Sequence, residues 1–130
     1  MRLWHKDLIP VLPRQQLLGQ WRECCCIAKS ILEKETPNHI LVNRVIDYPA
    51  THFNAYTLAV YKELRHRNYN ADWDKFRVYR VNRNFATNIS DVFPGWHNDR
   101  YLKQCYYNLQ EKYDCGGITE EEWNKIEERM

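Results

Sequence analysis

The sequence predicts a mainly α-helical, compact single domain of three long helices plus a short C-terminal helix, joined by long irregular connectors. Its 130 residues can enclose one hydrophobic core but not two independent ones. Three segments carry apolar residues at intervals of three or four, the period of a half-buried helix. Proline, asparagine and glycine fall between those segments, where such residues end helices.

The first long helix is expected from about Pro13 to Lys34. Arg22 and Glu23 lie to either side of its buried face, and the segment around Pro37 ends it. The buried face is marked by apolar residues three or four positions apart, namely Leu17, Trp21, Cys25, Ala28 and Leu32.

The second long helix is expected from about Ala50 to Arg67, after an extended connector or short strand over residues 40–48. The segment 73–91 fits neither the helix period nor the strand period cleanly, so both alternatives stay open there. The inward-facing residues of the second helix are Phe53, Tyr56 or Thr57, Val60, Tyr61 and Leu64.

The third long helix is expected from about Asn98 to Gly116, and residues 119–122 form a capping box that opens a short last helix. That last helix carries Trp123 and Ile126. The chain therefore divides into a helical domain over residues 1–117 and an acidic helix over residues 118–130, packed on that domain or tethered to it. The core positions expected in the third helix are Leu102, Cys105, Leu109 and Tyr113.

Charge is distributed unevenly along the chain. Residues 1–110 hold 16 basic and 10 acidic side chains, whereas residues 111–130 hold 3 and 7. A basic body with an acidic tail is compatible with a nucleic-acid partner, and the tail is then either a structural helix or a DNA mimic that covers the body. Seven basic residues lie among aromatic ones within residues 62–83. This pattern suits the binding of phosphates and unstacked bases. Alternatively, the basic residues form a solvated helix face and the aromatic residues belong to the core. They are Lys62, Arg65, Arg67, Lys75, Arg77, Arg80 and Arg83.

The five cysteines do not form a recognised metal-binding pattern. Cys24, Cys25 and Cys26 are consecutive, and side chains about 100° apart on a helix cannot all face one ion. No CxxC pair is present, so we expect reduced thiols, no metal and no organic cofactor.

The apolar runs fall far short of the roughly 20 residues that span a bilayer, and the N-terminus lacks a signal-peptide pattern. We therefore expect a cytoplasmic protein with no membrane partner.

The start of the chain offers three chemically complementary groups. The α-amine of Met1 is a nucleophile, because an α-amine has a pKa near 7.7–8.0, against about 10.4 for lysine. Glu23 supplies a carboxylate that can move protons. Arg2 and Arg22 supply planar guanidinium groups that suit phosphates. A mid-helix Arg–Glu pair is, alternatively, an ordinary exposed ion pair.

The residues from Leu12 to Glu23, with Gln16 before Leu17 and Trp21 before Arg22-Glu23, resemble the first helix of the pyrimidine-dimer DNA glycosylases, the phage-type endonuclease V repair enzymes. Residues 61–70 look like the end of that family's second helix, and residues 97–112 are similar to its third. Cys26 stands where the family has a further arginine, and the acidic tail replaces an aromatic and basic one. Because aminopeptidases that remove methionine act before small residues, Met1 before Arg2 is expected to be retained.

The resemblance implies a DNA glycosylase with abasic-site lyase activity on damaged pyrimidines in double-stranded DNA. It assigns catalysis to Met1 and Glu23, and DNA binding to Arg2, Arg22 and Lys112. Trp4 or Trp21 either fills the space that a displaced nucleotide leaves or belongs to the core. We expect a monomer without a small-molecule cofactor. The alternative is a non-catalytic nucleic-acid or protein interaction module that keeps the fold and uses residues 62–83.

Overall fold

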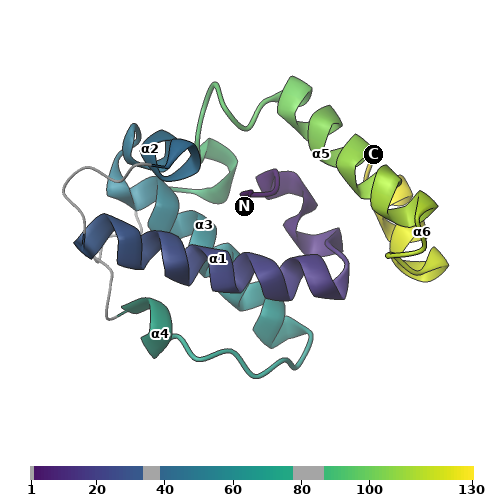
Figure 1. The fold of residues 1–130 in the computed structure, drawn as a ribbon, viewed down its shortest axis with the longest axis horizontal. Helices are drawn as coiled ribbons and strands as arrows, with labels where there is room; N and C mark the ends of the chain where they lie inside the picture. Colours follow the sequence, from purple (N-terminus) through teal and green to yellow (C-terminus); the bar gives the residue numbers. More distant parts are fainter. Residues whose placement is uncertain (1, 34–38, 78–86) are drawn as a thin grey trace.

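The protein is mainly helical, as predicted (Figure 1). The computed structural model describes residues 2–33, 39–77 and 87–130, and those residues contain no β-strand. None of the helices that they form is long and apolar enough to cross a membrane. In chain order the elements are the 3-10 turn η1 (Lys6–Val11), α1 (Arg14–Glu33), α2 (Ile40–Ile46), α3 (Ala50–His66), α4 (Asp74–Arg77), the 3-10 turn η2 (Ile89–Asp91), α5 (Asp99–Asp114) and α6 (Glu120–Arg129).

The long helix α1 lies at the centre and packs against α3, while α2 and α4 cover other parts of its surface. The N-terminal segment passes between α1 and α5 before it turns into η1 (Figure 1). Leu3 and Trp4 of this segment are buried, and the completely buried Tyr56 of α3 donates a hydrogen bond to the Trp4 carbonyl. The core therefore surrounds the beginning of the chain rather than excluding it.

The three long helices begin and end close to their predicted limits. The buried face of α1 is rotated relative to the prediction, because Leu32 is 50 % exposed and Cys25 only half-buried, whereas Cys24 and Ile27 are fully buried. A strict four-residue step drifts around the helix axis, since the α-helical period is 3.6 residues. In α5, Leu102 and Tyr113 are half-buried and the deeper positions are Cys105 and Leu109.

The prediction of an extended connector over residues 40–48 is wrong, because Ile40–Ile46 form α2. The β-branched residues of this segment favour strands when considered alone. Val42 and Val45, however, are three positions apart and both buried, which is a helical pattern, and α2 packs on α1. The His39 side chain accepts a hydrogen bond from the Leu41 amide and caps the helix.

The acidic C-terminal helix α6 packs against η1 and α5. Its predicted capping box is present, with the Thr119 and Glu122 side chains each accepting the other residue's amide. Trp123 and Ile126 are buried, and the Trp123 ring stacks on Tyr106 with a centroid separation of 5.3 Å. The helix is therefore part of the hydrophobic core.

Candidate active site

The N-terminal segment is fixed by side chains from three helices. The Gln20 amide group of α1 donates to the Arg2 carbonyl at 2.9 Å and accepts from the Trp4 amide at 2.7 Å. The Tyr56 hydroxyl of α3 donates to the Trp4 carbonyl at 2.6 Å and lies 3.0 Å from the Gln20 oxygen. Chain ends usually fray unless they are tied down in this way.

A second hydroxyl, from a third helix, completes this support. Tyr101 of α5 donates to the Leu3 carbonyl at 2.6 Å. Burial is the main reason that the pKa values of Tyr56 and Tyr101 both lie above the ordinary tyrosine value, so both hydroxyls keep their protons and act as donors. Residues 2–4 therefore have a fixed path through the protein.

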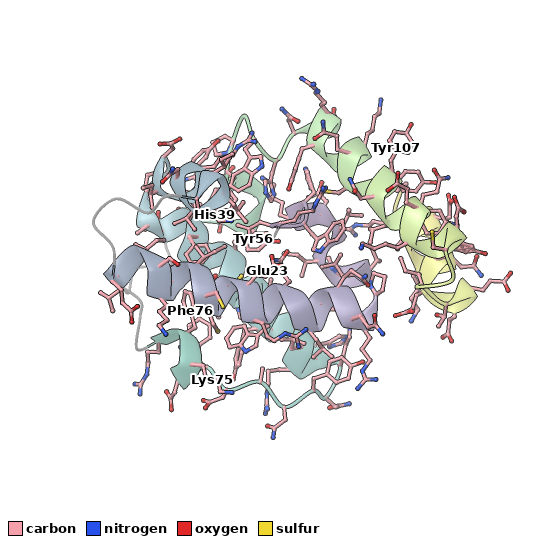
Figure 2. All side chains as sticks on the ribbon, viewed as in Figure 1. Glu23, His39, Tyr56, Lys75, Phe76 and Tyr107 are labelled. Atoms are coloured by element: carbon pink, nitrogen blue, oxygen red, sulfur yellow. The ribbon has the colours of Figure 1, made fainter. Side chains whose placement is uncertain are left out.

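The Glu23 side chain contacts the N-terminal segment at Arg2. Its carboxylate accepts a hydrogen bond from the backbone amide of Arg2 at 2.9 Å. Figure 2 labels Glu23 on α1, near the labelled Tyr56 in this view. The Arg2 nitrogen is the atom that joins Arg2 to residue 1. The carboxylate is therefore fixed beside the first peptide bond of the chain.

A cleft of about 370 Å³ opens at this point. Arg2 and Glu23, both predicted site residues, line it, and so does Lys112 of α5, which is exposed. The structure thus brings together three predicted residues that are up to 110 positions apart in the sequence. The remaining lining residues are Trp4, Gln16, Gly19, Gln20 and Asn108.

The other predicted residues are placed less centrally or lie outside the described part of the chain. Arg22 is exposed and does not line the cleft, although its guanidinium folds back toward Gly19 at the cleft. Trp4 lines the cleft but is only 8 % exposed, and its ring lies under the Arg2 guanidinium, 5.2 Å from the ring centroid. Trp21 is a core residue in contact with Tyr61 and Phe76. Met1 lies outside the described residues.

Sequence reasoning missed the glutamines of this site. Gln16, Gln20 and Glu23 follow one another at helical spacing, so a polar stripe on an otherwise amphipathic helix was readable from the sequence. Gln20 is 1 % exposed, and its polar atoms are satisfied by the N-terminal segment. The buried side-chain oxygen of Gln16 has no hydrogen-bond partner within the described residues, so this cleft-lining group is available to a ligand.

Beneath the N-terminal segment lie two stacked histidines, His5 and His97, with ring centroids 5.1 Å apart. The Nδ1 atom of His97 accepts from the Lys6 amide at 3.0 Å. Burial lowers the pKa of His97 to about 2, with further lowering by His5 when it is protonated and by the positive charges of Lys6 and Arg44, and burial also lowers the pKa of His5. Both rings are therefore neutral at physiological pH and serve as structural groups.

The cysteines behave as helix geometry predicts. Cys24 is buried, Cys25 half-buried and Cys26 exposed. Burial raises the pKa of Cys24 above the ordinary thiol range and that of Cys25 to about 11, so neither is a reactive thiolate at neutral pH. Among the described residues, no three histidine, cysteine or acidic side chains are arranged to hold a metal ion.

The fold and this cleft define a small helical protein with a carboxylate, two cations and a fixed N-terminal segment at one site. Comparison with known families agrees with that description: the family model described as pyrimidine dimer DNA glycosylase matches residues 1–76, more than half of the chain. The chain belongs to this family, and damaged DNA is accordingly its class of substrate. The matched region includes Arg2 and Glu23, while Lys112 lies beyond it. No curated protein and no solved structure matched the chain.

Proposed function

We propose that the protein removes damaged pyrimidines from double-stranded DNA and then breaks the strand by β-elimination, through an imine between the α-amine of Met1 and the sugar. The observation that carries this proposal is the hydrogen bond from the Arg2 amide to Glu23. The α-amine of residue 1 is only three covalent bonds from that amide nitrogen. A free α-amine on Met1 would therefore share the cleft with a carboxylate that is already oriented.

In the first step the neutral amine attacks C1′ of the damaged nucleotide, and the bond from C1′ to the base breaks, with the base leaving with the electron pair. The sugar ring then opens as the bond from C1′ to O4′ breaks and an imine forms between nitrogen and C1′. As the nitrogen bonds to C1′ it passes one of its protons to the Glu23 carboxylate, and Glu23 then gives that proton to O4′ as the ring opens, which leaves Glu23 ionised. A positioned acid of this kind typically accelerates a reaction by about 10²–10⁴-fold.

In the second step the imine makes the C2′ hydrogens acidic, because the electron pair left at C2′ is delocalised onto the imine nitrogen. Ionised Glu23 takes one C2′ proton, and the bond between C3′ and its phosphate oxygen breaks. The DNA strand is thereby cut on the 3′ side of the sugar. Water then hydrolyses the imine and regenerates the amine. One carboxylate serves as acid first and as base afterwards.

Arg2, Arg22 and Lys112 are proposed to bind the phosphates around the lesion. Arg2 and Lys112 line the cleft, and Arg22 lies beside it at Gly19. The Arg2 guanidinium lies over the Trp4 ring and also contacts the Cys105 thiol, which keeps the planar group in one orientation, and its remaining N–H groups suit phosphate oxygens. Three cations around one carboxylate suit a substrate that carries a negative charge on each side of the reacting sugar.

The alternative, an interaction module that uses residues 62–83, gains less support. Tyr61 and Phe76 pack on Trp21, and Phe76 is completely buried, so aromatic residues of this stretch belong to the core. The Arg77 side chain is paired with Asp74 at 3.0 Å. Tyr79, Arg80 and Arg83 lie outside the described residues.

The proposal is tested by trapping the imine. Native protein is incubated with abasic or ultraviolet-irradiated duplex and sodium borohydride, which reduces the imine to a stable covalent adduct. Mass spectrometry of the digested adduct should locate the sugar on the N-terminal peptide. Intact mass of the unreacted protein first establishes that Met1 is present and unmodified.

The matched control is the same protein with an acetylated N-terminus. Acetylation removes the nucleophile and leaves every lysine in place, so both trapping and strand cleavage should be lost. An acetylated protein that cleaves as fast as the native one would show that the nucleophile is elsewhere. A native protein that binds the duplex but never forms an adduct would favour the interaction module.

A further inference from the structure

A second cleft lies next to the proposed active site and shares Arg2 with it. This side cleft has a volume of about 280 Å³ and is lined by residues of α2 and its N-cap His39, by Trp96 in the segment before α5, by α5 and by Arg2. Among the residues that the structure describes, no carboxylate lines it, in contrast to the cleft near Arg14, whose lining includes Glu63, Glu121 and Glu122. The lining residues of the side cleft that carry the argument are Arg2, Arg44, Trp96, Tyr101 and Gln104.

Arg44 is held in this cleft by an aromatic surface. Its guanidinium lies 4.7 Å from the centroid of the Trp96 ring, and Trp96 itself is 2 % exposed. Arg44 is exposed, and no carboxylate among the described residues pairs with it, since the arginine–carboxylate pairs found there are Arg67–Glu63 and Arg77–Asp74. Stacking fixes the plane of the group and leaves its N–H edges open to an anion.

The two clefts follow one stripe of α5. Tyr101 and Gln104 line the side cleft, whereas Asn108 and Lys112 line the proposed active site. These residues are three or four positions apart and therefore share one face of the helix. Eleven residues of α-helix span about 16 Å. Arg2 belongs to both clefts, so the stripe runs from Arg44 past Arg2 to Lys112.

We propose that the side cleft is a second phosphate-binding site, in which Arg44, oriented by Trp96, binds the backbone of the damaged DNA on the side of the lesion away from Lys112. The inference rests on the proposed function and adds the path of the DNA to it. A length of about 16 Å corresponds to roughly four or five base-pair steps at 3.4 Å each. Arg44 and Lys112 would then contact phosphates on opposite sides of the nucleotide that Arg2 and Glu23 receive.

The test measures affinity for a duplex that contains a tetrahydrofuran abasic analogue, which has no aldehyde at C1′ and cannot form the imine. The variant is Arg44→Gln, because glutamine ends in a planar polar group but carries no charge. Its affinity should fall about tenfold, the expected loss for one charged hydrogen-bonded contact. The slope of log affinity against log salt should fall by about 0.9, the value for one phosphate.

Arg65→Gln is the matched control. Arg65 is an exposed arginine on α3 that lines neither cleft, and it lies in the basic stretch 62–83. Its substitution should leave the affinity and the slope unchanged. An Arg65 variant that is impaired as strongly as the Arg44 variant, or an Arg44 variant with wild-type affinity and slope, would overturn the proposal.

Neutral methylphosphonates placed one at a time along the duplex locate the contact without depending on how the variant folds. Wild-type protein should lose affinity at one phosphate on each side of the lesion. The loss on one side should disappear in Arg44→Gln and the loss on the other in Lys112→Gln. Losses confined to one side would overturn the proposal. Because the analogue is not cleaved, this result is independent of whether the imine mechanism holds.

Discussion

The Glu122 side chain of the last helix accepts a hydrogen bond from the backbone amide of Arg14, the first residue of α1, at 2.8 Å. Its other oxygen accepts the Thr119 amide at 3.1 Å. One carboxylate thus caps α1 and α6 together, and partial negative charge at a helix N-terminus is favourable. Partial burial alone would raise the pKa of Glu122, but these hydrogen bonds outweigh it and the pKa is lowered.

Deleting residues 118–130 should destabilise the protein strongly. The deletion exposes the surface that Trp123 and Ile126 cover, each worth about 1.5–3 kcal/mol, and it removes the cap on α1. A loss of that size lowers the melting temperature of a domain of this length by more than about 10 °C. Circular dichroism during heating measures it.

A charge-only variant, Glu120→Gln with Glu128→Gln, separates this role from a DNA mimic. Both residues are exposed, and Glu120 in the first turn of α6 contributes only about 0.3–1 kcal/mol through the helix dipole, so the melting temperature should fall by no more than a few degrees. DNA affinity, measured in salt, should also stay within about twofold of the wild-type value. Salt screens the weak long-range effects of exposed charges. A truncated protein that melts normally and binds DNA more tightly would establish the tail as an inhibitor instead.

The second prediction concerns Glu23. Glu23→Gln keeps an oxygen that can accept the Arg2 amide but cannot exchange protons, so strand cleavage should fall by about 10²–10⁴-fold while DNA affinity stays nearly constant. Arg22→Ala should show the opposite balance, with weaker binding and a salt slope lower by about 0.9. Glu33→Gln, an exposed carboxylate at the end of α1, is the control and should cleave normally. Wild-type turnover in the Glu23 variant would remove this residue from the mechanism.

Gln20 is expected to position the N-terminal segment. Gln20→Ala leaves the Arg2 carbonyl and the buried Trp4 amide without their partner, and each unsatisfied buried group costs about 1–3 kcal/mol. The free energy of unfolding should fall by about 2–5 kcal/mol, measured by urea titration. The rate of adduct trapping should also fall at temperatures where the variant is folded. Gln15→Ala, at an exposed position on the same helix, should change neither quantity.

Much of the fold could be predicted because the decisive signals are local. The 3.6-residue period and the turn residues predicted α1, α3 and α5, and Thr119 with Glu122 predicted the start of α6. The failure at α2 has the opposite cause. Two buried valines decide that segment by packing on α1, and local strand propensity pointed the other way.

The site was predictable only in part. The resemblance indicated Glu23 and Arg2, and the structure places them 2.9 Å apart through the backbone amide. The contributions of Gln20, Tyr56 and Tyr101 depend on contacts that join positions 16 to 98 residues apart. Nothing in the local sequence around a tyrosine shows which distant carbonyl it will meet. The Arg44–Trp96 stack, 52 positions apart, was hidden for the same reason.

The last prediction is that acid destabilises the protein through His97 at pH values where carboxylates are still ionised. The folded protein binds a proton at His97 only near pH 2, whereas an unfolded histidine binds one near pH 6.5. Between these two pH values the unfolded state holds more protons than the folded state does. The free energy of unfolding therefore rises with pH over this range, and the protein loses stability as the pH falls below about 6.5. The slope is about 1.4 kcal/mol per pH unit for one such group.

Urea titrations at pH 5.0, 5.5, 6.0, 6.5 and 7.0, roughly above the ordinary carboxyl pKa range, measure this slope. His97→Asn keeps a side-chain acceptor for the Lys6 amide and cannot titrate, so this variant should be less stable at pH 7 but show a flatter dependence on pH. His5 and His52, whose pKa values are also lowered by burial, account for the slope that remains. His66→Asn, at an exposed position on α3, serves as the control and should keep the wild-type slope. If His97→Asn kept the full wild-type slope of unfolding free energy against pH, His97 would contribute nothing to the acid sensitivity. The acid sensitivity would then originate at other groups.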